Sequence, residues 1–120
     1  MWIIRMNNTW FISDQHFTHK NVLEFEKRPF FTIEEMQVKM IDAWNAVVGK
    51  YDTVYVVGDF CFGKHLVWES ILDQLKGNVT LIKGNHDRTK VIDRVKEDGF
   101  LEEIHTVGHL LKMDKYYLNI

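Results

Sequence analysis

Three short apolar segments, each followed by side chains that can bind a metal ion, constrain this chain more than any other feature. The segments are rich in β-branched and aromatic residues, as β-strands are, and they cover residues 9–13, 53–57 and 79–82. Potential ligands follow each of them: Asp14 and His16, then Asp59, then Asn85, His86 and Asp87. Open α/β folds place their ligand sites at the carboxyl ends of parallel strands. The pattern therefore predicts one shared site at one edge of a sheet.

The stretches between these segments have helical periodicity. Thr32 and Glu35 form a capping box that predicts a helix from residue 33, which Gly49 ends. Two further helices are expected at about 64–75, stopped by Gly77, and after Thr89, ending at Gly99. The inward-facing residues are expected to be Ile33, Met36, Met40, Ile41, Trp44, Val47 and Val48, then Leu66, Val67, Ile71, Leu72 and Leu75, then Val91, Ile92 and Val95.

The order of these elements predicts an α/β fold with a parallel sheet. Residues 103–120 alternate between apolar and polar positions and are expected to form a hairpin that turns near Asp114-Lys115. Residues 1–5 are expected to lie outside the first strand. The absence of repeats and linkers in 120 residues predicts a single domain over residues 1–120.

The composition excludes several classes of function. The formal net charge is −2, so there is no basic excess of the kind that nucleic-acid-binding surfaces need. The single cysteine, Cys61, excludes an internal disulfide and predicts a buried position near the site and a reducing, cytoplasmic compartment. The apolar run at residues 1–4 is too short for a signal peptide, and no stretch is long enough to span a bilayer.

The residues after the three strands suit a dinuclear metal site. Asp14 and His16 are two positions apart, so in an extended segment both side chains point the same way and can bind one ion. The Asp59 carboxylate can bridge two ions, and Asn85 offers a neutral oxygen to the second. Such mixed ligands favour Mn, Fe, Zn or Ni, and paired ions are a recurrent device for hydrolysing phosphoesters. His86 is then the candidate proton donor to the leaving oxygen.

Other polar residues have roles outside the predicted metal ligands. Asp87 is a candidate for orienting a neighbouring imidazole, as carboxylates outside a metal's ligand set commonly do. His19 either contacts the substrate or makes a structural hydrogen bond, and Arg28 either binds a phosphate group or forms a surface ion pair. His65 and His105 are expected to be exposed helix and strand residues.

Taken together, these motifs resemble the calcineurin-like metallophosphoesterase family over nearly the whole chain. The resemblance is greatest to its small bacterial and phage phosphoesterases, which share the Ser-Asp-x-His-Phe-x-His-x-Asn pattern of residues 13–21 and the Arg-Pro-Phe of residues 28–30. The resemblance implies two β-sheets packed face to face between helical layers (αββα). It also implies specific roles, with Asp14 and His16 on the first metal, Asp59 bridging, Asn85 on the second metal, and His86 as the catalytic histidine.

The chain departs from the family pattern towards its end. The family adds a histidine after a later strand and then a Gly-His-x-His turn, which supply three further ligands, and neither motif is present. His109 follows a glycine but precedes Leu110-Leu111, so it does not form that turn. These departures predict one or two metal ions per chain and a domain that is truncated at its carboxyl end. They also predict a bare strand at residues 116–120 that pairs with another chain in a homo-oligomer.

The expected function is that of a metal-dependent phosphoesterase acting on a phosphomonoester or phosphodiester. Its partners would be phosphorylated small molecules or nucleotides, and no interaction with a membrane is expected. The alternative is a catalytically impaired phosphoesterase scaffold that binds a nucleotide or a protein. A third interpretation is that the 120 residues are a piece of a longer product.

Overall fold

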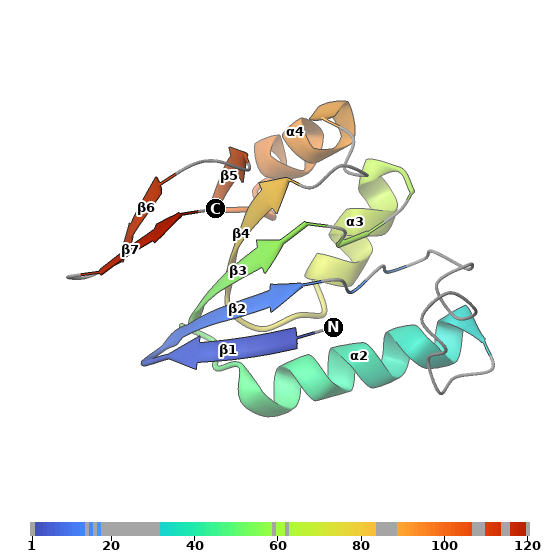
Figure 1. Ribbon diagram of the computed structural model, residues 1–120. Coiled ribbons are helices and arrows are strands. Elements are labelled where there is room, and N and C mark those ends of the chain that lie inside the picture. Colours follow the sequence, from blue (N-terminus) through green and yellow to red (C-terminus); the bar gives the residue numbers. More distant parts are fainter. Residues whose placement is uncertain are drawn as a thin grey trace.

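A computed structural model describes residues 2–13, 15, 17, 32–58, 60, 61, 63–83, 89–106, 110–113 and 116–119 (Figure 1). The elements follow in the order β1 (Trp2–Met6), β2 (Thr9–Ser13), α2 (Ile33–Val47), β3 (Thr53–Val57), α3 (His65–Leu72), β4 (Asn78–Lys83), α4 (Thr89–Glu97), β5 (Glu103–Thr106), β6 (Leu110–Met113) and β7 (Tyr116–Asn119). Strands and helices alternate through the middle of the chain, which confirms the predicted α/β class.

The main sheet has five strands in the order β1-β2-β3-β4-β5. β1 runs antiparallel to β2, and the other neighbouring pairs are parallel. β6 and β7 form a separate antiparallel pair in which Met113 lies opposite Tyr116, so the predicted turn position is confirmed. In Figure 1 this pair extends beyond the β5 edge of the main sheet.

Two strands differ from the sequence-based expectation. Residues 1–5 were expected to lie outside the first strand, but Trp2–Met6 form a strand of their own, which pairs with β2 across a short turn. Asn7 adopts a φ of 56° there, a conformation that asparagine tolerates better than most residues. Glu103–Thr106 was assigned to the terminal hairpin, but it joins the main sheet beside β4.

The core lies between one face of the sheet and the helices. Alternate residues of the strands point towards this face, and Figure 1 shows α2, α3 and α4 on the same side of the sheet. The core residues from the strands include Trp10, Ile12, Val54, Val56, Val79 and Leu81, and those from the helices include Met36, Met40, Trp44, Trp68, Ile71, Ile92 and Val95. None of the described helices combines the length and the apolar character that crossing a lipid bilayer requires.

Helix α2 begins as predicted and ends differently. The Thr32 hydroxyl accepts a hydrogen bond from the Glu35 backbone N–H at 3.0 Å, which confirms the amino-terminal cap. The helix ends at Val47, and Val48 leaves it in an extended conformation (φ −84°, ψ 127°). Gly49 was expected to end the helix, and it lies two residues after the last helical residue without a left-handed φ. Instead its N–H donates to the Asp52 carboxylate at 2.7 Å.

Three residues that were expected to face the core are exposed: Val47, Leu66 and Val67 have exposed fractions of 47%, 69% and 36%. Helix α3 is also shorter than predicted, because it ends at Leu72 rather than Leu75. It turns Trp68 inward instead, and the Trp68 ring lies 5.3 Å from the Phe60 ring. The large aromatic side chain therefore sets the buried face of this helix.

Helix α4 ends as predicted at Gly99. Gly99 has a φ of 88°, and the backbone N–H groups of Gly99 and Phe100 donate to Lys96 and Val95. This is the Schellman arrangement, in which a left-handed glycine allows the last carbonyl groups of a helix to be paired. It also reverses the chain so that Leu101 packs into the core.

The face of the sheet opposite the helices is apolar as well. Phe11 stacks on Tyr55 with ring centroids 5.2 Å apart, and Phe11 and Ile82 are buried. Ile4, which lies opposite Phe11 in the register, is 53% exposed. Among the described residues, no helix lies on this face. Both faces of the sheet thus carry side chains that gain stability from burial.

Candidate functional site

The carboxyl ends of three neighbouring strands lie level at one edge of the sheet. Ser13 of β2 pairs in register with Val57 of β3, and Val57 pairs with Ile82 of β4. The Gly58 N–H then donates to the Ile82 carbonyl at 2.7 Å. Gly58 has a φ of 69° and is buried, so a residue without a Cβ allows the chain to turn sharply at the end of β3. We call this side the carboxyl edge.

The segments that follow β2 and β3 are joined just beyond this edge. The Phe17 N–H donates to the Phe60 carbonyl at 2.8 Å, and Phe17 also forms a parallel bridge with Cys61. The rings of Phe17 and Phe60 lie 5.2 Å apart, and both side chains are fully buried. Phe60 in turn contacts Trp68 of α3. Aromatic packing therefore fixes the described parts of these two segments to each other and to α3.

All the side chains predicted to form the site lie outside the described residues. These are the predicted metal ligands Asp14, His16, Asp59 and Asn85, the predicted catalytic His86, and His19, Arg28 and Asp87. The structure does bring together the described residues that flank the predicted metal ligands. Ser13, Gln15 and Phe17 alternate with the first two ligands, Gly58 and Phe60 flank the third, and β4 ends at Lys83, two residues before Asn85.

Polar groups are buried at the carboxyl edge. Ser13 is 3% exposed, and its hydroxyl oxygen makes no hydrogen bond within the described residues. The Gln15 side chain is also buried, at 1% exposed. Burying a hydroxyl without a partner costs free energy, so groups of this kind are common where a ligand or a catalytic function requires them. Cys61 is buried and forms no disulfide, as predicted.

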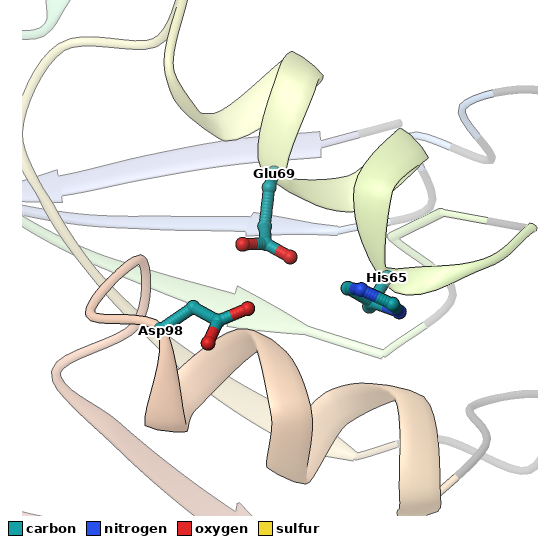
Figure 2. Close-up of side chains that lie close together, drawn as sticks. All are labelled: His65, Glu69 and Asp98. Carbon is teal, nitrogen blue, oxygen red and sulfur yellow. The ribbon is translucent and has the colours of Figure 1, made fainter.

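A second group of polar side chains was missed by the sequence analysis. His65 and Glu69 of α3 meet Asp98, which follows α4, and the potential ligand atoms all lie within 4.8 Å of one another (Figure 2). The expectation that His65 is an exposed helix residue is wrong, because it is half-buried. The available signal was the spacing of His65 and Glu69, since residues four apart lie on the same face of a helix. His105 of β5 is likewise half-buried.

Burial and charge shift the carboxyl groups of this second cluster. Burial raises the pKa of Glu69, and Asp98 raises it further through a hydrogen bond and charge repulsion. The pKa of Asp98 is lowered, mainly because Arg94 donates to it; the Arg94 Nε lies 3.2 Å from Oδ1 and 3.0 Å from Oδ2. Of the two groups, Glu69 is therefore the one that holds a proton more readily.

Similar sequences occur in an archaeon and in phages. The chain is 39% identical to the uncharacterized protein MJ1445 of Methanocaldococcus jannaschii over 85 residues, which cover 69% of this chain and 48% of that protein. It is 37% identical over 95 residues to the Gene 66 protein of Mycobacterium phage L5, covering 74% of this chain and 44% of that protein. The chain thus spans about half the length of the curated relatives it matches. No family model matches it.

A solved structure supports the architecture. The crystal structure of AQ665, a protein of unknown function from Aquifex aeolicus, matches with a TM-score of 0.69 and 27% sequence identity. The match covers 91% of this chain and 56% of that protein. The arrangement of strands and helices described above therefore occurs in a larger α/β protein.

Proposed function

We propose that this protein is a metal-dependent phosphoesterase whose site lies at the carboxyl edge. The observation that carries the proposal is the register of β2, β3 and β4, which end side by side. The sequence places potential metal ligands just after each of these three ends: Asp14 and His16, then Asp59, then Asn85 and His86. A parallel sheet can gather ligands from separate parts of the chain in this way.

The donor set fits divalent metal ions. Imidazole, carboxylate and amide groups together suit Mn, Fe, Zn or Ni, and the buried Ser13 hydroxyl adds a polar group beside the first ligand pair. We assign Asp14 and His16 to one ion, Asp59 to a bridging position and Asn85 to a second ion. When bound, such ions supply a hydroxide nucleophile and neutralise the charge on the phosphoryl oxygens.

The remaining assigned residues act on the substrate or on the ligands. His86 follows Asn85 directly in the sequence, and we assign it the protonation of the leaving oxygen. Asp87 would hold an imidazole in the orientation it needs, while His19 and Arg28 would contact the phosphorylated small molecule or nucleotide. The single cysteine, Cys61, fits a cytoplasmic enzyme.

We propose in addition that the main sheet is one layer of a metallophosphoesterase-like β-sandwich. The face of the main sheet opposite the helices carries buried Phe11 and Ile82, as a face covered by a second sheet would. The separate β6–β7 pair is a candidate for part of that second sheet. We also expect the outer edge of β7 to pair with a second copy of the chain and so to form a homo-oligomer.

Hydrolysis of bis-p-nitrophenyl phosphate by one purified sample, measured together with its metal content before and after manganese is added, tests the proposal. We expect turnover that depends on manganese. Asp59→Asn should lower the rate more than about 100-fold, since loss of groups that merely orient ligands costs roughly 10–100-fold. Asp42→Asn, on the exposed side of α2, is the matched control and should retain the rate. Equal rates in the two variants would disprove the assignment of Asp59.

A binding function is the second candidate. The assignment above gives the second ion two ligands, Asp59 and Asn85, and the first ion three, so a weakly held second ion favours a scaffold that binds a nucleotide or a protein without turnover. Wild-type protein that takes up one ion or none and shows no hydrolysis, yet binds a nucleotide, would support this candidate over the enzyme.

A further inference from the structure

The contact between α3 and α4 contains a polar cluster that the proposed phosphoesterase site does not use. His65, Glu69 and Asp98 point towards one another in Figure 2, two of them from α3 and one from the residue after α4. Three side chains of types that bind metals, with all ligand atoms within 4.8 Å of one another, satisfy the basic geometric requirement for a shared ion.

Glu69 provides independent evidence that the cluster receives a ligand. Its exposed fraction is 9%, and its Oε2 atom is buried without a hydrogen-bond partner in the part of the chain that the structure describes. Its carboxylate points into the space between the other two side chains. A buried carboxylate oxygen is unfavourable unless a donor or a cation pairs with it.

A shared proton satisfies this arrangement less completely than a cation. A proton between Glu69 and Asp98 would relieve the repulsion of two neighbouring carboxylates, but it would not engage the imidazole of His65. A divalent ion can relieve the repulsion and bind all three side chains. The mixture of one nitrogen and two oxygen ligands suits Zn²⁺ and similar transition metals.

The distances and the surroundings fit such an ion. Zn²⁺ binds nitrogen and oxygen ligands at about 2.0–2.2 Å, so two ligands on opposite sides of it are at most about 4.4 Å apart. The potential ligand atoms of His65, Glu69 and Asp98 all lie within 4.8 Å of one another, which is close to that limit. Arg94 contacts both oxygens of Asp98 and holds this carboxylate in place, as groups around metal sites commonly hold the ligands.

We propose that His65, Glu69 and Asp98 form a second binding site for a divalent transition-metal ion, which ties α3 to α4. The site is separate from the carboxyl edge and uses none of the residues assigned there. Helix α3 follows the segment that contains Asp59, and α4 follows the segment that contains Asn85 and His86. An ion bound between α3 and α4 would therefore hold in place the helices that follow both of these segments.

Zinc titration in a double-variant background tests this site apart from the first one. Asp14→Asn with Asp59→Asn removes two of the ligands assigned to the carboxyl edge, and binding of Zn²⁺ is then measured by isothermal titration calorimetry. We expect about one ion per chain to remain bound. Adding Glu69→Gln or His65→Gln should weaken its binding at least tenfold. Glu102→Gln, an exposed residue before β5, is the matched control and should leave the affinity unchanged.

Thermal unfolding with and without a chelator shows whether a variant has simply failed to fold. In chelator, Glu69→Gln should unfold at the same temperature as its parent or higher, because it removes the repulsion between two carboxylates. Zinc should then raise the unfolding temperature of the parent and of Glu102→Gln, but not that of Glu69→Gln. The proposal is overturned if the background binds no zinc, or if Glu69→Gln binds it as tightly as the control. Either result stands whether or not the wild-type protein hydrolyses phosphoesters.

Discussion

The two ends of strands β2, β3 and β4, which form the carboxyl edge and the amino edge, use polar groups in opposite ways. At the amino edge, where β2, β3 and β4 begin, the Asp52 carboxylate accepts hydrogen bonds from the Trp10 indole at 2.9 Å and the Gly49 N–H at 2.7 Å. The Asp52 carbonyl also accepts from the N–H of Asn78, the first residue of β4. One residue therefore joins the end of α2 to the starts of three strands, and its polar atoms serve the fold.

At the carboxyl edge, apolar contacts hold the chain and polar groups are left over. Phe17, Phe60 and Trp68 pack together there, while the buried Ser13 hydroxyl has no hydrogen-bond partner among the described residues. The difference teaches that stability at this edge comes from the burial of apolar side chains, whereas at the amino edge hydrogen bonds to a carboxylate contribute to it. The comparison predicts that substitutions at the two edges change the free energy of unfolding by different amounts and with a different dependence on pH.

The largest effect is expected from Phe60→Ala at the carboxyl edge. Phe60 is 1% exposed and its ring contacts Phe17, Trp44 and Trp68, so its loss should lower the free energy of unfolding by about 3–5 kcal/mol. Urea denaturation at pH 7 and at pH 3 measures it, and the loss should be the same at both. Leu66→Ala, which removes a side chain that is 69% exposed, should stay within about 0.5 kcal/mol. A small loss for Phe60→Ala would show that this edge is held in another way.

A smaller, pH-dependent effect is expected from Asp52→Asn at the amino edge. The Gly49 N–H, and then the Trp10 indole, lower the pKa of Asp52 below its ordinary value of 3.8. A lowered pKa means that the ionised group stabilises the fold at pH values above 3.8, and that this contribution is lost as the pH falls through the folded-state pKa. The variant should therefore be less stable than wild type at pH 7, with the difference shrinking below pH 4.

Urea denaturation between pH 7 and pH 2.5 measures this difference. Asparagine keeps the size of the side chain and one acceptor oxygen, so the variant isolates the charge. Asp42→Asn on α2 serves as the exposed control. A difference between Asp52→Asn and wild type that is constant with pH would mean that Asp52 acts through its shape alone.

The smallest effect on stability is expected from Ser13→Ala. The substitution removes a buried hydroxyl that has no partner within the described residues, so the free energy of unfolding should be unchanged or rise by up to about 1 kcal/mol. Chemical denaturation at pH 7 is the measurement. A loss above 1 kcal/mol would show that the hydroxyl makes a stabilising hydrogen bond and would remove the contrast between the edges.

The sequence predicted the middle of the fold well because several local signals agreed there. For α2, the Thr32 cap and the spacing of Met36, Met40 and Trp44 gave the same answer, and both are confirmed. β1 was missed because its apolar run is short and its turn residues, Asn7 and Asn8, lack the glycine that usually marks a two-residue turn. The inward face of α3 was confirmed at Ile71 and Leu72 but wrong in the first turn of the helix, because periodicity alone does not show which apolar side chain meets Phe60.

The two candidate sites differ in how far the sequence predicted them. The sequence predicted a site at the carboxyl edge, because side chains that come directly after adjacent parallel strands leave the backbone at neighbouring positions. The cluster of His65, Glu69 and Asp98 depends on how α3 packs against α4, which brings together residues about 30 positions apart. The sequence showed the spacing of the first two and contained no local signal for the third.

The strand order has a consequence for synthesis of the chain. β2, β3, β4 and β5 lie side by side in the order in which a ribosome makes them, so each new strand can dock on the one completed before it. Growth at a single open side requires no strand to be inserted between two others. The segments after β2 and β3 can therefore meet through Phe17 and Phe60 before β4 has been translated. Strand β4 then docks beside β3, with the carboxyl edge already formed by two strands.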